Sequence, residues 1–172
     1  MLVQGEYMIN QHLYLNRDSL IANTGVGVLG LVILDAQEYE RWMKSAYKTL
    51  ESARRDRENG FYNWACFKSH QASEKALKAL LWGIGRPRPG HTLVHLLLQL
   101  EKELGVEAPV SVKQACATLD KYYIPTRYPD AWVEGSPEDY FTEADADDAL
   151  EKALVIVKWV EGVWRELSRR GE

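Results

Sequence analysis

The residues best suited to bind a charged ligand lie together in a short tract, residues 120–130. This tract holds three tyrosines and one arginine, Arg127, around two prolines. The planar guanidinium of arginine can hold two phosphate oxygens at once, and tyrosine offers a flat ring on which a nucleobase can stack. The tract therefore predicts a nucleotide-binding surface. A purely structural interpretation stays open, in which Arg127 pairs with Asp130 or Asp120 and the tyrosines seal one end of the fold.

A second group of polar residues recurs with helical spacing between residues 61 and 82. His70, Glu74 and Lys78 follow one another at intervals of four, and Gln71 lies beside them. This spacing places them on one helix face, where they could line a cleft. The alternative is that Glu74 and Lys78 form an ordinary exposed ion pair, which contributes only about 0.2–0.5 kcal/mol.

The histidines and cysteines do not form a metal-binding pattern. His91 and His95 lie four residues apart, but no glutamate follows His91 and no third ligand is evident. We therefore expect structural roles for both. Cys66 and Cys116 each lie in an apolar helical pattern, which predicts neither a disulfide nor a zinc site. No glycine-rich phosphate loop, dinucleotide fingerprint or nucleophile elbow is present, so we expect no metal and no other cofactor.

The elements that must position these residues are helices. Apolar residues recur three and four apart over residues 35–57, 61–82, 91–104, 111–123 and 142–170. We expect an all-α fold, an antiparallel up-and-down bundle of four to five helices. An apolar seam on the last helix faces either the core or a second copy of the chain. Its residues are Leu150, Ala153, Val157, Val160, Trp164 and Leu167.

The segments outside these helices differ in character. Residues 124–141 form a long irregular segment, and segments of this length inside a compact domain are often functional. Residues 1–34 carry few charges and two β-like stretches around a turn, which favours a small β-hairpin as much as a loosely ordered leader. We therefore divide the chain into an N-terminal extension, residues 1–34, and a helical bundle domain, residues 35–172.

Composition and charge argue against several functional classes. The 172 residues are 46% hydrophobic and 27% charged, so the chain can bury a core. A net charge of −4 and a pI near 5.6 argue against a non-specific DNA-binding protein. No apolar run reaches the roughly 20 residues of a membrane-spanning helix. With two scattered thiols and no basic opening segment, we expect a reducing cytoplasm as the location.

Three motifs in combination resemble the HEPN domain (higher eukaryotes and prokaryotes nucleotide-binding). They are His70–Leu80, Gly90–Leu93, and Tyr122–Tyr123 with Thr126–Asp130, and the resemblance spans about residues 36–168. It implies an antiparallel helical bundle, commonly a homodimer. Family members are often encoded beside a minimal nucleotidyltransferase, with which they form toxin–antitoxin-like or nucleotide-transfer pairs. Others are ribonucleases, and one branch binds nucleotides directly.

The same resemblance implies which residues line a nucleotide cleft. They come from the loop that begins at Arg127 and from the polar face around His70. The candidate nucleotide-binding residues are Arg127, Tyr128, Asp130, Tyr123, His70, Lys75 and Lys78.

One departure from the family pattern bears on catalysis. The ribonuclease members carry an arginine followed, after four to six residues, by a histidine, whereas this chain has no histidine after His95. Without that imidazole, no obvious group activates a ribose 2′-hydroxyl near neutral pH. We therefore expect a non-catalytic protein that binds a nucleotide, partners a nucleotidyltransferase, or does both. The alternatives are a ribonuclease toxin that uses Arg127 with His70 or His95, and a structural helical dimer or adaptor.

Overall fold

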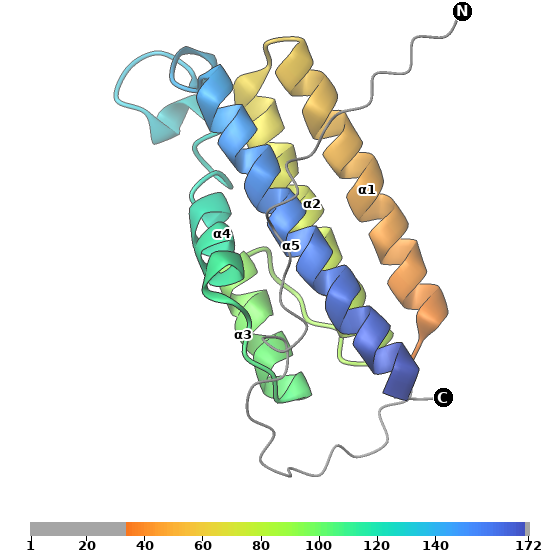
Figure 1. Cartoon of the computed structure of the whole chain (residues 1–172). Coiled ribbons are helices and arrows are strands. Elements are labelled where there is room, and N and C mark those ends of the chain that lie inside the picture. The colour runs from red at the N-terminus through yellow and green to blue at the C-terminus, as the bar shows by residue number, and fades with distance from the viewer. Residues whose placement is uncertain (1–33, 171–172) are drawn as a thin grey trace, which may run out of the picture.

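A computed structural model describes residues 34–170, and this part of the chain is an all-α bundle without strands (Figure 1). The five α-helices are α1 (Ala36–Glu58), α2 (Tyr62–Gly83), α3 (Leu93–Leu104), α4 (Val110–Asp120) and α5 (Glu143–Arg170). The helical bundle that the sequence predicts is therefore confirmed. The predicted hairpin of residues 1–34 lies almost entirely outside the described residues. Among the described helices, none is long and apolar enough to cross a membrane.

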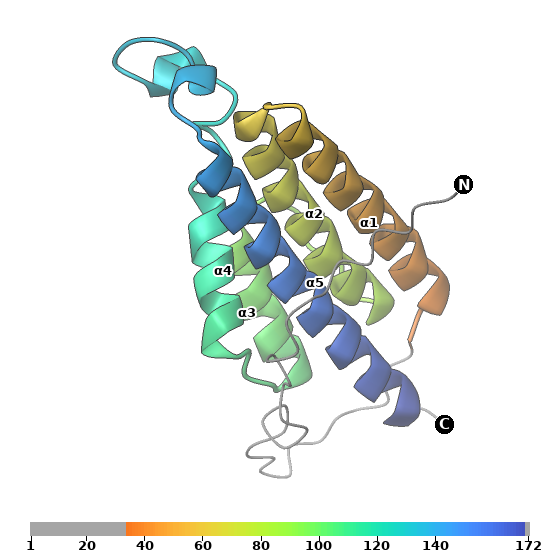
Figure 2. The same ribbon diagram turned by 45° about the horizontal axis from the view of Figure 1, so that its top comes forward.

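Helix α2 lies at the centre of the bundle and contacts each of the other four helices, while α5 crosses in front of it between α1 and α4 (Figures 1 and 2). Its sequence allows close approach because small residues alternate with bulky ones. Ala65, Ala72 and Ala76 are fully buried, as are Leu77 and Leu80. Such a helix, apolar around most of its circumference, is what a central position in a bundle requires.

The apolar seam of α5 faces the core of the same chain. Val160 is fully buried and Val157 is 3% exposed without any second copy present. Trp164, further along the seam, stacks on Tyr39 of α1 with ring centroids 4.0 Å apart. The sequence leaves open whether this seam packs into the core or against a second copy of the chain. The structure supports packing into the core.

The connection between α2 and α3 departs from a strict up-and-down path and sets the position of the site. Two glycines with positive φ, Gly85 and Gly90, and two prolines keep this segment irregular. It runs back along α2, so that α3 starts beside the middle of α2 and runs in the same direction (Figure 1). As a result His91, just before α3, lies against Glu74.

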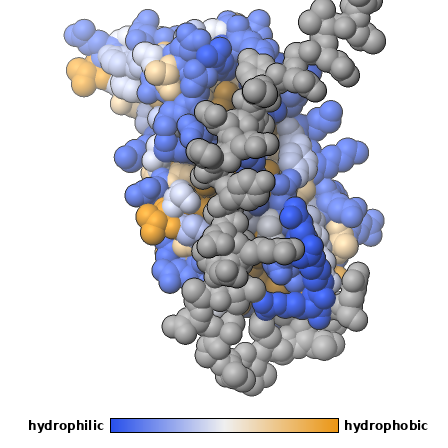
Figure 3. Space-filling model, in the orientation of Figure 1, coloured by the Kyte–Doolittle hydropathy of each residue, from blue (hydrophilic) through white to orange (hydrophobic). Residues whose placement is uncertain are grey.

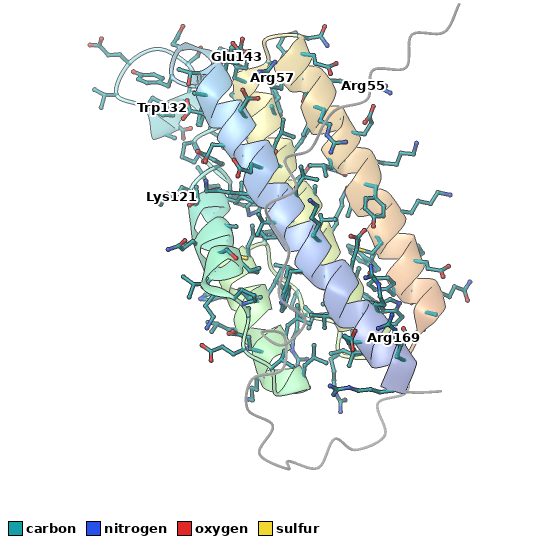
Figure 4. All side chains as sticks on the ribbon, in the orientation of Figure 1. Arg55, Arg57, Lys121, Trp132, Glu143 and Arg169 are labelled. Carbon is teal, nitrogen blue, oxygen red and sulfur yellow. The ribbon has the colours of Figure 1, made fainter. Side chains whose placement is uncertain are left out.

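Residues 124–141 form a lobe at one end of the bundle, beyond the start of α5 (Figure 2). Two short 3-10 turns, Pro129–Ala131 and Pro137–Asp139, shape it. Trp132 lies in this lobe, stacks on Tyr140 at 3.9 Å and donates its indole N–H to the carbonyl of Pro125 (Figure 4). The lobe is therefore a packed structure of its own.

Charged side chains join the helix ends next to this lobe. Arg57, near the end of α1, pairs with Glu143 at 2.7 Å and with Asp147 at 2.7 Å, both on the first turns of α5 (Figure 4). The described part of the face in Figure 3 is mainly hydrophilic, with scattered apolar residues. Nothing on that part of the face resembles the extended apolar surface of an obligate interface.

Candidate functional site

Arg127 is held in place by aromatic rings. Its Cζ lies 4.3 Å from the ring centroid of Phe67, 4.5 Å from that of Tyr123 and 4.9 Å from that of Tyr128. Its Nε donates to the carbonyl of Tyr123 at 2.8 Å. Cation–π contacts of this kind each contribute about 0.5–2 kcal/mol. The guanidinium is therefore fixed in orientation while two of its nitrogens stay available.

No carboxylate of the described residues forms an ion pair with Arg127, so the expected pairing with Asp130 or Asp120 is wrong. Asp130 is exposed. The carboxylate of Asp120 faces His70 and the start of α3 instead. Because Arg127 lacks an anionic partner within this part of the chain, it can pair with an anion from solution.

Tyr123 brings three parts of the chain to one place. Besides contacting Arg127, its ring lies 5.2 Å from that of His91, nearly parallel, and 5.0 Å from that of His70. His91 comes from the α2–α3 connection, His70 from α2 and Tyr123 from the turn after α4. The site is thus built where the start of α3 and the end of α4 meet the middle of α2.

Below His91 lies a buried group of charges. Glu74 accepts from Lys78 Nζ at 2.8 Å, and His91 Nδ1 lies 3.1 Å from both oxygens of Glu74. The side chains of Glu74 and Lys78 are each only 11% exposed. Glu74 and Lys78 therefore form the expected ion pair. The pair is buried rather than exposed, because the α2–α3 connection covers it, so the expectation of an ordinary exposed pair is wrong.

The contact with Glu74 selects one tautomer of the His91 ring. A carboxylate only accepts hydrogen bonds, so Nδ1 carries the hydrogen and Nε2 of the neutral ring is the acceptor. The His91 side chain is 57% exposed. Within this site an oriented, exposed imidazole and the unpaired guanidinium of Arg127 therefore both contact the Tyr123 ring.

Asp120 links α4, α3 and α2. Its carboxylate accepts from the backbone N–H groups of Leu93 at 2.7 Å and Val94 at 3.1 Å, and lies 3.3 Å from His70 Nε2. Burial alone would raise the pKa of Asp120, but these hydrogen bonds outweigh it and hold the pKa below its ordinary value. His70 is fully buried, and its Nδ1 has no partner among the described residues.

The structure brings together five of the seven candidate residues. Tyr123, Arg127 and Tyr128 form the aromatic surface, His70 lies beneath it, and Lys78 belongs to the buried charges. The other two do not join them. Lys75 bonds to Thr49 of α1 at 2.7 Å, and burial lowers its pKa, whereas Asp130 is exposed on the lobe.

Three residues of the site are absent from the predicted nucleotide-binding residues: His91, Asp120 and Glu74, of which only Glu74 is expected from the sequence to line a cleft. Only one signal could have found His91, namely its place in the Gly90–Leu93 motif. His95, for which the sequence also predicts a structural role, is exposed and does not pack into the core.

No group of three or more metal-ligating side chains occurs within residues 34–170. Cys66 and Cys116 are both buried and unpaired there, and burial raises the pKa of each thiol to about 12. Deprotonated thiols are the form that binds metal or acts as a nucleophile. Both cysteines therefore belong to the core.

The features above define a class of protein: a five-helix bundle with a polar site where α2 meets the ends of α3 and α4. The family model for the HEPN domain matches residues 39–163. The chain therefore belongs to the HEPN family, which includes nucleotide-binding and ribonuclease-like proteins.

Solved structures agree with this assignment. TT1696 from Thermus thermophilus is 38% identical over 73% of this chain and 97% of its own, with a TM-score of 0.69. ST0689, an archaeal HEPN homologue, is 42% identical over 72% of this chain and 95% of its own, with a TM-score of 0.61. The HEPN domain protein TM0613 from Thermotoga maritima is 32% identical over 73% and 98%, with a TM-score of 0.59. No curated protein matches the chain.

Proposed function

We propose that this HEPN protein binds a nucleotide through its phosphates at Arg127. The observation that carries the proposal is the guanidinium itself, which is fixed by three aromatic rings and one carbonyl and has no carboxylate partner among the described residues. An arginine held in this way loses little side-chain entropy on binding, and its two terminal nitrogens match two phosphate oxygens.

The surroundings of Arg127 suit a nucleotide better than a simple anion. Tyr128 is 46% exposed and offers a ring for stacking. His91 adds an imidazole ring that stacks on Tyr123. A ligand that carries both phosphate and an aromatic base can use all of these groups.

We infer the cellular role from the family resemblance. In this proposal the protein is a non-catalytic homodimer in the cytoplasm that partners a minimal nucleotidyltransferase in a toxin–antitoxin-like pair. The candidate residues keep the roles given above, with Arg127 on phosphate and Tyr123 and Tyr128 on the base. Lys75 and Asp130 are the weakest members of the set, because one bonds to α1 and the other lies on the lobe.

Thermal unfolding against a panel of nucleotides tests the proposal. A ligand at 100 times its dissociation constant stabilises the folded state by about 2.7 kcal/mol, which raises the Tm by several degrees. Arg127→Ala should abolish the shift, while Arg54→Ala, which removes an exposed arginine of α1, should keep it. A shift that survives Arg127→Ala would refute this site. No shift with any nucleotide would favour the structural dimer or adaptor.

A second candidate function, metal-independent RNA cleavage, is favoured by one observation, the hydrogen bond of His91 to Glu74. In serine proteases a carboxylate orients the catalytic histidine in the same way. Neither histidine named in the sequence-based alternative suits this role, since His70 is fully buried and His95 lies outside the aromatic cluster.

The side chains of His91 and Arg127 could together cleave RNA. His91 Nε2 would take the proton of a ribose 2′-hydroxyl, whose oxygen attacks the adjacent phosphorus while Arg127 binds the phosphate oxygens. The 5′-oxygen leaves and takes a proton from water. Cleavage of a mixed RNA substrate in EDTA that stops with His91→Ala would establish it, and intact RNA with the purified wild-type protein would remove it.

A further inference from the structure

A pocket lies next to His91. It has a volume of about 340 Å³ and is formed between the α2–α3 connection and the first turns of α3. Gly90 and Thr92, the two chain neighbours of His91, both line it. Its size falls at the lower end of the range of about 300–1,000 Å³ typical of ligand pockets.

The pocket and the arginine site are linked through the contacts of two rings. Arg127 contacts Tyr123, Tyr123 stacks on His91, and the pocket opens beside His91. In this series of contacts the His91–Tyr123 stack lies between Arg127 and the pocket. This order matches the order of phosphate, sugar and base in a nucleotide.

The pocket walls combine apolar and hydrogen-bonding groups. Pro89 and Leu96 provide apolar surface, while Thr92, His95 and Gln99 provide a hydroxyl, an imidazole and an amide. Thr92 precedes α3 but its side chain makes no capping hydrogen bond, because Asp120 already holds the N–H groups there. Its hydroxyl is therefore available to a ligand.

The charge at the pocket disfavours other kinds of ligand. Its one arginine, Arg88, is held by Glu103 at 2.9 Å, so a second strongly anionic group gains little from entering. None of the described carboxylates lines the pocket, so a cation gains nothing either. A neutral, flat ring with donors and acceptors on its edge fits best, since apolar walls contact its faces while amide and hydroxyl groups bond its edge.

We propose that this pocket, rather than the rings of Tyr123 and Tyr128, holds the base and ribose of the nucleotide whose phosphates lie on Arg127, so that Thr92 and Gln99 determine which base binds. This inference rests on the proposed function. The pocket is a second subsite, and its residues Thr92 and Gln99 can be substituted without changing Arg127.

Isothermal titration calorimetry of the full chain with ATP, GTP, CTP, UTP and inorganic triphosphate tests the inference. The variant is Thr92→Val with Gln99→Ala, and the control is Gln114→Ala, an exposed glutamine of α4. Wild-type protein should bind at least one nucleotide about tenfold tighter than triphosphate, because base contacts add to the phosphate contacts. The double variant should lose this advantage and bind triphosphate as before, while the control should match wild type.

Three results would overturn the inference. If the double variant binds every nucleotide like wild type, the pocket takes no part and Arg127 alone carries binding. If wild-type protein binds triphosphate as tightly as all nucleotides, the base makes no contact. If wild-type protein binds none of the five probes, the proposed function fails together with the pocket. Helical circular dichroism of the double variant shows whether it is folded.

Discussion

Replacing Asp120 by alanine should destabilise the bundle far more than an ordinary cap substitution. The Asp120 carboxylate accepts two backbone N–H groups from the start of α3 and contacts the buried ring of His70. One side chain therefore stabilises the start of α3, fixes the end of α4 and pairs with α2. Alanine removes all three contacts at once.

The magnitude follows from two contributions. Loss of a helix cap costs about 0.5–2 kcal/mol. His70, fully buried, would then lack partners at both ring nitrogens among the described residues, and an unsatisfied buried polar group costs about 1–3 kcal/mol. We expect Asp120→Ala to lower the free energy of unfolding by about 2–4 kcal/mol, a large part of the roughly 5–15 kcal/mol typical of a domain.

Urea unfolding followed by helical circular dichroism measures this change, with Asp35→Ala as the matched control. Asp35 caps α1 through a single bond, from Glu38 N at 3.0 Å, so its loss should cost only about 1 kcal/mol. Equal costs for the two variants would refute the idea that Asp120 joins three helices.

The pH dependence gives an independent check. Because the folded pKa of Asp120 is lower than in the unfolded chain, its ionised form stabilises the fold. This stabilisation is complete above the unfolded pKa of about 3.9 and is lost as the pH falls through the folded pKa. The difference between wild type and Asp120→Ala should therefore be constant from about pH 7 to 5 and shrink below about pH 4. A difference that grows on acidification would contradict the assignment.

Other predictions follow from the core. Gly83→Ala should destabilise the fold by about 1–3 kcal/mol in urea unfolding, since its Cβ would lie 2.5 Å from the Trp164 ring; unchanged stability would contradict this packing. Val160→Asp buries an unpaired carboxylate in the core and should abolish the helical signal; a folded variant with only a changed mass in light scattering would instead indicate an interface. Cys66 and Cys116, with thiol pKa values raised to about 12, should react with a thiol reagent only at the rate of unfolding, and fast labelling of native protein would contradict their burial.

Most of the helical fold could be predicted from the sequence because it depends on local patterns. Apolar spacing defines the helices, and Asp35 with Glu38 marks the start of α1. The predicted helix boundaries are wrong where a residue distant in the sequence determines where a helix begins or ends. Helix α3 begins at Leu93 rather than at His91, and α4 ends at Asp120 rather than Tyr123, because the carboxylate at the end of α4 caps the start of α3.

The site could be predicted only in part, for a similar reason. Arg127 and Tyr123 stand out in a tract rich in tyrosine and proline. The burial of Glu74 depends on the path of the α2–α3 connection, which spacing within one helix does not reveal. Lys75 follows Glu74 directly in sequence, but one step around a helix turns a side chain by about 100°, so it faces α1 instead.

The Nε–Hε resonance of Arg127 in nitrogen-15 NMR spectra tests the central claim most directly. Its bond to the Tyr123 carbonyl should slow exchange with water and make the signal visible, and Arg127→Lys would assign it by its absence. Titration with the nucleotide that gives the largest thermal shift should move this signal and leave in place that of Arg57, whose Nε bonds to Asp147. A nucleotide that binds while the Arg127 signal stays fixed would contradict the proposal that Arg127 holds the phosphates.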